Sequence, residues 1–153
     1  MSTTSVSQRD DGTARVRRIA RPAFALFFAL HGIVHYVGFA VPFGLMTTES
    51  NVFTTQALWG RLDLGDGRAR ALGVAYLALI VPSLIAAVGI WREARWALPL
   101  VVVVAAVSGV VCALGSPNAT IGLAIDGLVI GLVVLVPRVL SSHGRPLWGP
   151  SRG

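Results

Sequence analysis

Residues 24–41 read FALFFALHGIVHYVGFAV, an apolar run in which His31 and His35 are the most polar side chains. The apolar segment around it extends from about residue 19 to residue 43. At about 1.5 Å per residue, a helix of this length crosses the ~30 Å hydrocarbon core of a bilayer. A cleaved signal peptide is the alternative, but its apolar core is normally about 7–15 residues, and no small-x-small cleavage site follows. We therefore predict a membrane-spanning helix over residues 19–43.

Three further apolar segments have the length of a membrane span: residues 71–91, 96–114 and 120–140. Pro82 lies near the middle of the first of them and predicts a kink there. The chain is 54% hydrophobic and only 13% charged, with a mean hydropathy of +0.72, whereas soluble domains are about 25% charged. The sequence thus predicts an all-α fold, an integral membrane bundle of four transmembrane helices packed up and down. Residues 1–18 are predicted to be a disordered cytoplasmic tail and residues 141–153 a second cytoplasmic tail.

The basic residues lie at the ends of the apolar segments. The chain has 13 of them, all arginine, against 7 acidic residues, for a net charge of +6. With the N-terminus inside, ten arginines fall on the cytoplasmic side and three, Arg61, Arg68 and Arg70, on the outer side. The positive-inside rule then places both termini in the cytoplasm and the chain in the plasma membrane. Because no arginine stripe with interleaved aromatic residues is present, we expect no nucleic-acid partner. The expected partners are the lipid bilayer and a second copy of the chain or another membrane protein.

Each predicted span contributes a polar side chain at a similar depth. Counting about 1.5 Å per residue, Asp126 and Tyr76 lie about 9 Å below the outer surface of the hydrocarbon. His35 lies about 6–12 Å below that surface and His31 about 6 Å deeper, while Ser108 is within a turn of the same level. His31 and His35 are four residues apart and share one helix face. Ionisable groups in hydrocarbon require partners, so we predict a buried polar site made of these five residues.

Three interpretations of this site stay open. The first is a structural hydrogen-bond network, since interhelical polar contacts contribute about 0.6 kcal/mol on average and up to ~2 kcal/mol in model systems. The second is a small transporter or proton-coupled protein, because histidine and carboxylate chains relay protons in membranes. The third is a redox or metal site, in which His31, His35 and Asp126 form a two-histidine, one-carboxylate set. No further ligand stands out, and no cofactor is predicted.

The sequence contains no phosphate-binding glycine loop, no CxxC and no HExxH motif, so it does not indicate an enzyme. A structural or accessory membrane protein is the favoured function.

Three glycines reduce the side-chain bulk on one side of the last predicted span, which permits close packing within the bundle or in a homodimer. They are Gly122, Gly127 and Gly131. The single cysteine, Cys112, is interpreted as a small buried apolar residue. The loop sequence ESNVFTTQALWGRL, residues 49–62, predicts either a short interfacial helix or a plain loop.

Two stretches resemble a known family. HGIVHYVGF, residues 31–39, resembles the HGxxHxxGF opening of a family of small bacterial four-span membrane proteins that has no assigned activity. GSPNATIGLAIDGLVI, residues 115–130, resembles the last span of that family, which follows a short turn and often carries Asp or Asn near its start. The likeness covers about residues 22–137, and the four-helix plan is also similar to that of DoxX-type proteins. The resemblance implies a bacterial four-span architecture and supplies no activity.

Overall fold

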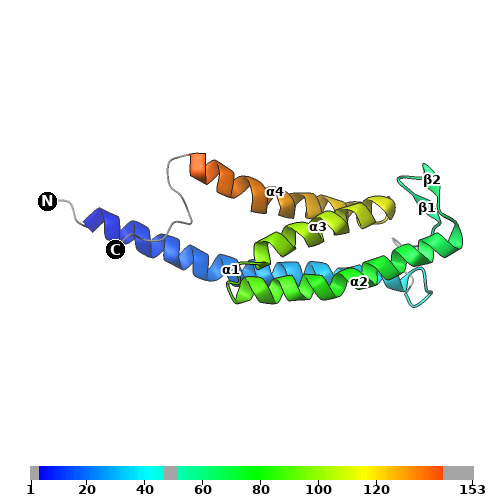
Figure 1. Cartoon of the computed structure of the whole chain (residues 1–153), viewed down its shortest axis with the longest axis horizontal. Coiled ribbons are helices and arrows are strands. Elements are labelled where there is room, and N and C mark those ends of the chain that lie inside the picture. The colour runs from blue at the N-terminus through cyan, green and yellow to red at the C-terminus, as the bar shows by residue number, and fades with distance from the viewer. Residues whose placement is uncertain (1–3, 47–51, 143–153) are drawn as a thin grey trace.

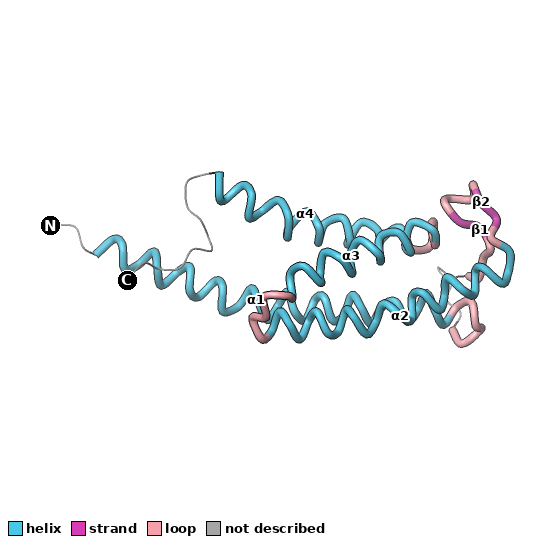
Figure 2. Tube along the Cα trace, in the orientation of Figure 1, coloured by secondary structure: helices cyan, strands magenta, loops and turns pink. Residues whose placement is uncertain are grey.

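The computed structural model describes residues 4–46 and 52–142, with side chains for residues 19–46 and 52–134. Four α-helices make up most of it (Figure 1): α1 Thr4–Ala40, α2 Gly65–Trp91, α3 Ala97–Leu114 and α4 Thr120–Ser142. Among the described residues, the strands are limited to β1 Gln56–Ala57 and β2 Leu62–Asp63 (Figure 2). The prediction of an all-α fold is confirmed.

Three of the helices are long and apolar enough to cross a membrane. They comprise 22 residues of α1 from Ile19 to Ala40, the 27 residues of α2 and the 18 residues of α3, with mean hydropathies of 1.7, 2.3 and 2.7. Large apolar side chains on the outward faces of these helices are exposed, which is compatible with lipid surroundings. The side chains of α4 are described only from Thr120 to Val134, and this described part is shorter than a membrane span requires. The structure therefore supports three spans, and the fourth stays a prediction.

The helix ends differ from the predicted span ends in several places. α1 begins at Thr4, so residues 4–18 are helical where we predicted a disordered tail. These residues contain no proline and include good helix formers such as arginine, which extend a helix already nucleated by the apolar segment. α1 ends at Ala40 rather than at residue 43, and α2 begins at Gly65 rather than at residue 71. Residues 143–153 of the predicted C-terminal tail lie outside the described residues.

α1 and α2 pack closely because glycines face the neighbouring helix. A Cβ atom added to Gly32 would overlap Ser83 Cβ, and one added to Gly38 would lie 2.6 Å from Tyr76 Cγ. Small residues of this kind let membrane helices approach at short distance. α3 packs against α2 and α4, whereas α1 and α4 come near each other at few points (Figure 1). The bundle is thus tight on one side of α1 and looser on the other.

The buried apolar residues form two clusters at different heights of the bundle. The larger one centres on Phe28, Val101 and Val129, each almost completely buried. The smaller one joins α2 to α3 and consists of Tyr76, Leu79, Val111 and Cys112. On α3, Ser108 falls between the residues of the two clusters, and on α4, Asp126 falls between Leu123 of the smaller cluster and Val129 of the larger one. Tyr76 is itself part of the smaller cluster.

The loop between α1 and α2 is a hairpin and not a helix over its described part. β1 and β2 pair antiparallel, with Gln56 opposite Asp63. The Trp59 N–H donates to the Ser116 carbonyl at 3.2 Å. The Asn118 side-chain amide donates to the Val52 carbonyl, also at 3.2 Å. These two hydrogen bonds attach the loop to the turn between α3 and α4.

Candidate functional site

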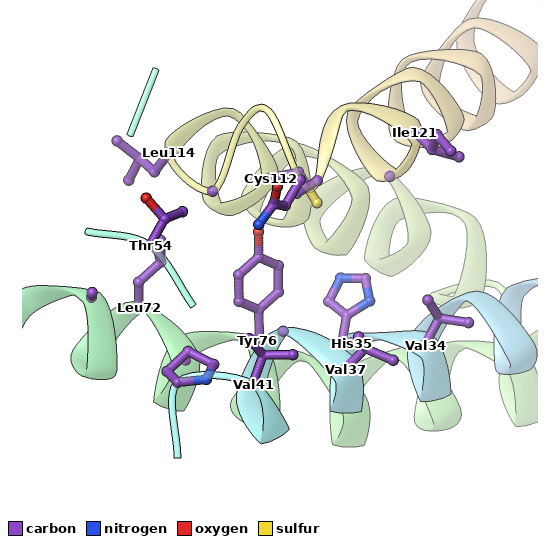
Figure 3. A pocket seen from close by; sticks show the side chains of 18 of the residues that line it. Val34, His35, Val37, Val41, Thr54, Leu72, Tyr76, Cys112, Leu114 and Ile121 are labelled. Atoms are coloured by element: carbon purple, nitrogen blue, oxygen red, sulfur yellow. The ribbon is translucent and has the colours of Figure 1, made fainter. Parts of the chain in front are cut away.

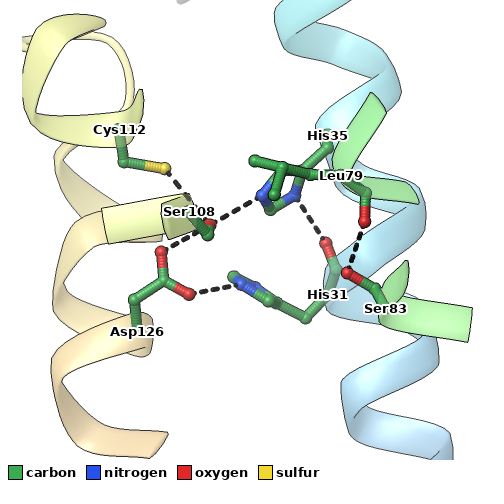
Figure 4. A network of polar contacts seen from close by, with 7 residues as sticks. All are labelled: His31, His35, Leu79, Ser83, Ser108, Cys112 and Asp126. Atoms are coloured by element: carbon green, nitrogen blue, oxygen red, sulfur yellow. Dashed lines mark hydrogen bonds and ion pairs between the residues drawn. The ribbon is translucent and has the colours of Figure 1, made fainter. Parts of the chain in front are cut away.

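His31 and His35 face the interior of the bundle from α1, where only 9% and 6% of their surfaces are exposed. Their spacing of four residues stacks them on one helix face. The His35 Nδ1–H donates to the backbone carbonyl of His31 at 3.0 Å. This bond occupies one ring nitrogen within α1, and the other, Nε2, is directed toward α3 (Figure 4).

Ser108 of α3 and Asp126 of α4 meet the two histidines, and both are 1% exposed. His31 Nε2 lies 2.9 Å from Asp126 Oδ1, and Ser108 Oγ lies 2.6 Å from Asp126 Oδ2. His35 Nε2 lies 2.7 Å from Ser108 Oγ. Four of the five predicted site residues therefore form one hydrogen-bonded chain, His31–Asp126–Ser108–His35, which we call the polar network. It connects α1, α3 and α4.

The polar network requires one more hydrogen than neutral histidines beside an ionised carboxylate can supply. A serine hydroxyl donates a single hydrogen, yet Ser108 Oγ sits between two groups that would both act as acceptors. If Ser108 donates to Asp126, then His35 must donate through Nε2 as well as Nδ1, and it is an imidazolium. If Ser108 donates to His35, then Asp126 is protonated and donates to Ser108. Both arrangements leave the network electrically neutral, as a site of low polarity favours.

Tyr76 lies beside the polar network without bonding to it. Its hydroxyl donates to the Val111 carbonyl at 3.1 Å, and its ring meets His35 edge-on with the centroids 5.8 Å apart. Cys112, which the sequence suggested was only a packing residue, has its sulfur 3.9 Å from Ser108 Oγ. The spacing of four residues between Ser108 and Cys112 places both on one face of α3, and this is the signal that could have indicated the contact.

A cavity of about 500 Å³ lies beside the polar network (Figure 3). His31 and His35 line it together with Tyr76 and Cys112, whereas Ser108 and Asp126 lie behind the histidines and are not part of its wall. Most of the remaining wall is apolar and includes Leu30, Val34, Phe53, Ile121 and Ile125. A mostly apolar cavity of this volume with a few polar groups is typical of a small-molecule site.

His31 lines this cavity, and its second ring nitrogen is not engaged by any described residue. Its Nε2 is engaged by Asp126, and no hydrogen bond reaches Nδ1 from the part of the chain that the structure describes. Every side-chain nitrogen or oxygen there that is shut off from solvent has a partner. Nδ1 must therefore be accessible, and the space that His31 lines is the cavity. When Nε2 carries the hydrogen, Nδ1 is an unoccupied acceptor.

The donor atoms of the predicted metal set are turned toward protein partners and not toward one common point. His31 Nε2 faces Asp126 directly, and His35 Nε2 faces Ser108. Among the side chains of residues 19–46 and 52–134, no group of three or more His, Cys, Asp or Glu is placed to hold a metal ion. A ligand in the cavity would instead meet His31 Nδ1.

The three predicted packing glycines have different surroundings. A Cβ atom on Gly122 would lie 2.9 Å from Cys112 Sγ, so this glycine allows α4 to approach α3. Gly127 is exposed, and a Cβ atom there would meet nothing within 4 Å among the described residues. Gly131 is half-buried. The structure thus brings Gly122 to a contact between helices and leaves Gly127 on the outside of α4.

No protein-family model, curated protein or solved structure matches this chain. The resemblance over residues 22–137 therefore stays a prediction. The polar network and the cavity beside it are the observations on which a function can rest.

Proposed function

We propose that this chain is a four-span protein of the bacterial plasma membrane, with both termini cytoplasmic, and that it is a small proton-coupled membrane protein. In this proposal the polar network takes up and releases one proton at the cavity. The observation that carries it is the position of Ser108 Oγ, 2.7 Å from His35 Nε2 and 2.6 Å from Asp126 Oδ2. Removing the extra proton leaves one of these two contacts without a hydrogen, so the contacts depend on proton occupancy.

Access to the polar network is one-sided, which supports a proton-binding site rather than a channel. His31 and His35 reach the cavity on one side. On the other side, the cluster around Phe28, Val101 and Val129 is tightly buried and apolar. A proton has no polar partner in that cluster. Exchange is therefore expected through the cavity, at the histidine edge of the network.

A structural role is the second candidate, and one observation favours it. α1 and α4 come near each other at few points, and the contact between His31 and Asp126 bridges them directly. The polar network would then fix the spacing of these helices, and its protonation would have no further consequence. Interhelical hydrogen bonds of this type contribute about 0.6 kcal/mol each on average.

The variant Asp126→Asn separates the two candidates. An asparagine amide can accept from His31 and donate to Ser108, as a protonated Asp126 would, but it has no exchangeable acid proton. In lipid nanodiscs at neutral pH, we expect the wild type to show one of two signatures. Either infrared spectra contain a protonated carboxyl band that Asp126→Asn lacks, or nitrogen NMR shows His35 protonated on both ring nitrogens. Alkaline titration should remove that signature.

Ser83→Ala is the matched control, because Ser83 is as deeply buried as Ser108 but bonds within its own helix. It should keep the signature of the wild type, whereas Ser108→Ala should change it. A neutral His35 together with an ionised Asp126 at neutral pH would contradict the proton-coupled function. A normal melting temperature of Asp126→Asn combined with that result would leave the structural role as the better explanation.

A further inference from the structure

The cavity reaches the outside of the bundle between α1 and α4. Leu30, Val34 and Ile121 line the cavity, yet they are 53%, 63% and 78% exposed. Residues that belong both to a cavity wall and to the outer surface mark a mouth of that cavity. α1 and α4 make few contacts with each other, and all three side chains are aliphatic. Because the predicted membrane spans are surrounded by lipid, this mouth opens toward the acyl chains of the bilayer.

A second mouth lies at the loop end and differs in chemistry. Val52 and Phe53 line it, together with the polar Thr54, Gln56 and Asn118. The hydrogen bond from Asn118 to the Val52 carbonyl attaches the loop across this end. The aliphatic mouth is thus the route for a molecule dissolved in lipid, and the loop end is the route for one dissolved in water.

The polar groups inside the cavity limit what the head of such a molecule can be. Both ring nitrogens of His35 are engaged within the protein, and the Tyr76 hydroxyl is engaged by the Val111 carbonyl. Of the histidine nitrogens in the described part of the wall, His31 Nδ1 is therefore the one left to accept a hydrogen bond from a ligand beside the polar network. An acceptor nitrogen requires a hydrogen-bond donor, and the apolar walls disfavour a charged group. An uncharged O–H group meets both requirements.

We propose that the cavity binds a lipid-soluble molecule with a single uncharged hydroxyl group, which enters between α1 and α4 and donates its O–H to His31 Nδ1. The ligand identity rests on the proposed function, because the opposite nitrogen of the same ring bonds Asp126 and so connects the ligand to the proton site. The volume of about 500 Å³ suits a molecule of this kind.

A matched pair of probes tests the head group. We would titrate the full chain in lipid nanodiscs with para-hexylphenol and with para-hexylanisole, which has the same body but no O–H. Nitrogen NMR of labelled histidine reports the His31 Nδ1 resonance directly. The phenol should shift this resonance in a saturable way, and the anisole should not. Equal shifts with both probes, or no shift with either, would overturn the proposal.

A matched pair of variants tests the route. Val34 and Val81 are valines of nearly equal exposure, 63% and 61%, on the outside of α1 and α2. Val34 lines the cavity, and Val81 is not among its lining residues. Val34→Trp should weaken phenol binding by at least about tenfold, while Val81→Trp should bind as the wild type does. Unchanged binding in Val34→Trp would rule out the mouth between α1 and α4.

The variant Asp126→Asn keeps this test independent of the proposed function. Its side-chain oxygen still accepts from His31 Nε2–H, so His31 Nδ1 stays an acceptor and phenol binding should persist. Absence of the proton signature in the wild type, with phenol binding present, would defeat the proton-coupled function alone. The reverse result, a proton signature in the wild type without phenol binding, would defeat the ligand assignment alone.

Discussion

The two sides of α1 achieve helix packing by different means. Against α2, Gly32 brings the backbones so close that an added Cβ atom would overlap Ser83, and the Ser83 hydroxyl donates back to the Leu79 carbonyl of its own helix at 2.7 Å. Against α3 and α4, the helices stand further apart, and Ser108 bonds to side chains of two other helices. Two equally buried serines thus have opposite roles.

The difference shows what a polar side chain is needed for in an apolar bundle. Where backbones touch through glycine, dispersion contacts hold the helices together and a hydroxyl can be satisfied locally. Where the helices diverge around a cavity, directional bonds replace the missing contacts. We call the contact of α1 with α2 the close side and the contact of α1 with α3 and α4 the open side. The stability of the close side should therefore be sensitive to added side-chain volume, and that of the open side to lost hydrogen bonds.

The largest effect is expected from Asp126→Ala on the open side. It leaves His31 Nε2 and the Ser108 hydroxyl without their carboxylate partner in a buried site. Removing one member of a buried ion pair or hydrogen-bonded acid costs about 3 kcal/mol or more. Unfolding in mild detergent followed by circular dichroism would measure it. Asp126→Asn should lose much less, and equal losses in both variants would break the contrast between the two sides.

A smaller loss is expected from Gly32→Ala on the close side. The new methyl group overlaps Ser83 Cβ, which cannot swing away as the end of a long side chain can. Overpacking of this kind costs about 1–3 kcal/mol. Gly127→Ala is the control, since its methyl group meets no described atom within 4 Å and gains the same helix propensity, about 1 kcal/mol. If both variants were stabilised equally, the close side would not be limited by volume.

The serine pair sharpens the same comparison. Ser108→Ala removes the group between His35 and Asp126, and we expect a loss of about 1–2 kcal/mol. Ser83→Ala removes a bond to a carbonyl that its own helix already satisfies, so the expected change is below about 0.5 kcal/mol. Melting temperatures of the two variants in the same detergent would test this order. A larger loss for Ser83→Ala would reverse our assignment of the two roles.

The smallest effect is expected outside both packed sides, at Asp63 in the hairpin. The Gly65 N–H donates to Asp63 Oδ1 at 2.9 Å, and this bond lowers the pKa of the carboxyl group. A lowered pKa in the folded state means that the ionised form stabilises the fold above the ordinary carboxyl pKa. That stabilisation is lost as the pH falls through the lower folded value. Hydrogen exchange at Gly65 should therefore differ between wild type and Asp63→Asn at neutral pH and converge in acid.

The heights of the polar residues could be predicted from the sequence alone. A helix rises by a fixed amount per residue, and the span ends are marked by arginines and turn residues. Counting from those ends places His35, Asp126 and Ser108 within about a turn of one another and His31 about 6 Å deeper. The structure brings all four into one hydrogen-bonded chain, with His31 as the histidine that meets Asp126. Tyr76 comes to the same level but bonds elsewhere, because height alone does not determine which way a side chain points.

The contact faces could not be predicted in the same way. A helix that is apolar all round carries no pattern that distinguishes its buried side from its outer side. Gly127 looked as suitable for packing as Gly122, yet only Gly122 meets a neighbouring helix in the structure, at Cys112. Nothing in the sequence indicated that Gly32 packs against a neighbouring helix, although its close contact with Ser83 limits the distance between α1 and α2. These features depend on the partner helix, which a single segment does not specify.

The hydroxyl of Ser108 has a consequence for how the molecule would be observed. When one hydrogen moves from His35 Nε2 to Ser108 Oγ and the Ser108 hydrogen moves to Asp126 Oδ2, the charges on His35 and Asp126 disappear while every carbon, nitrogen and oxygen atom stays in place. X-ray diffraction would record one picture for both charge distributions. Neutron diffraction from deuterated protein, or a solvent isotope effect on proton release, would tell them apart.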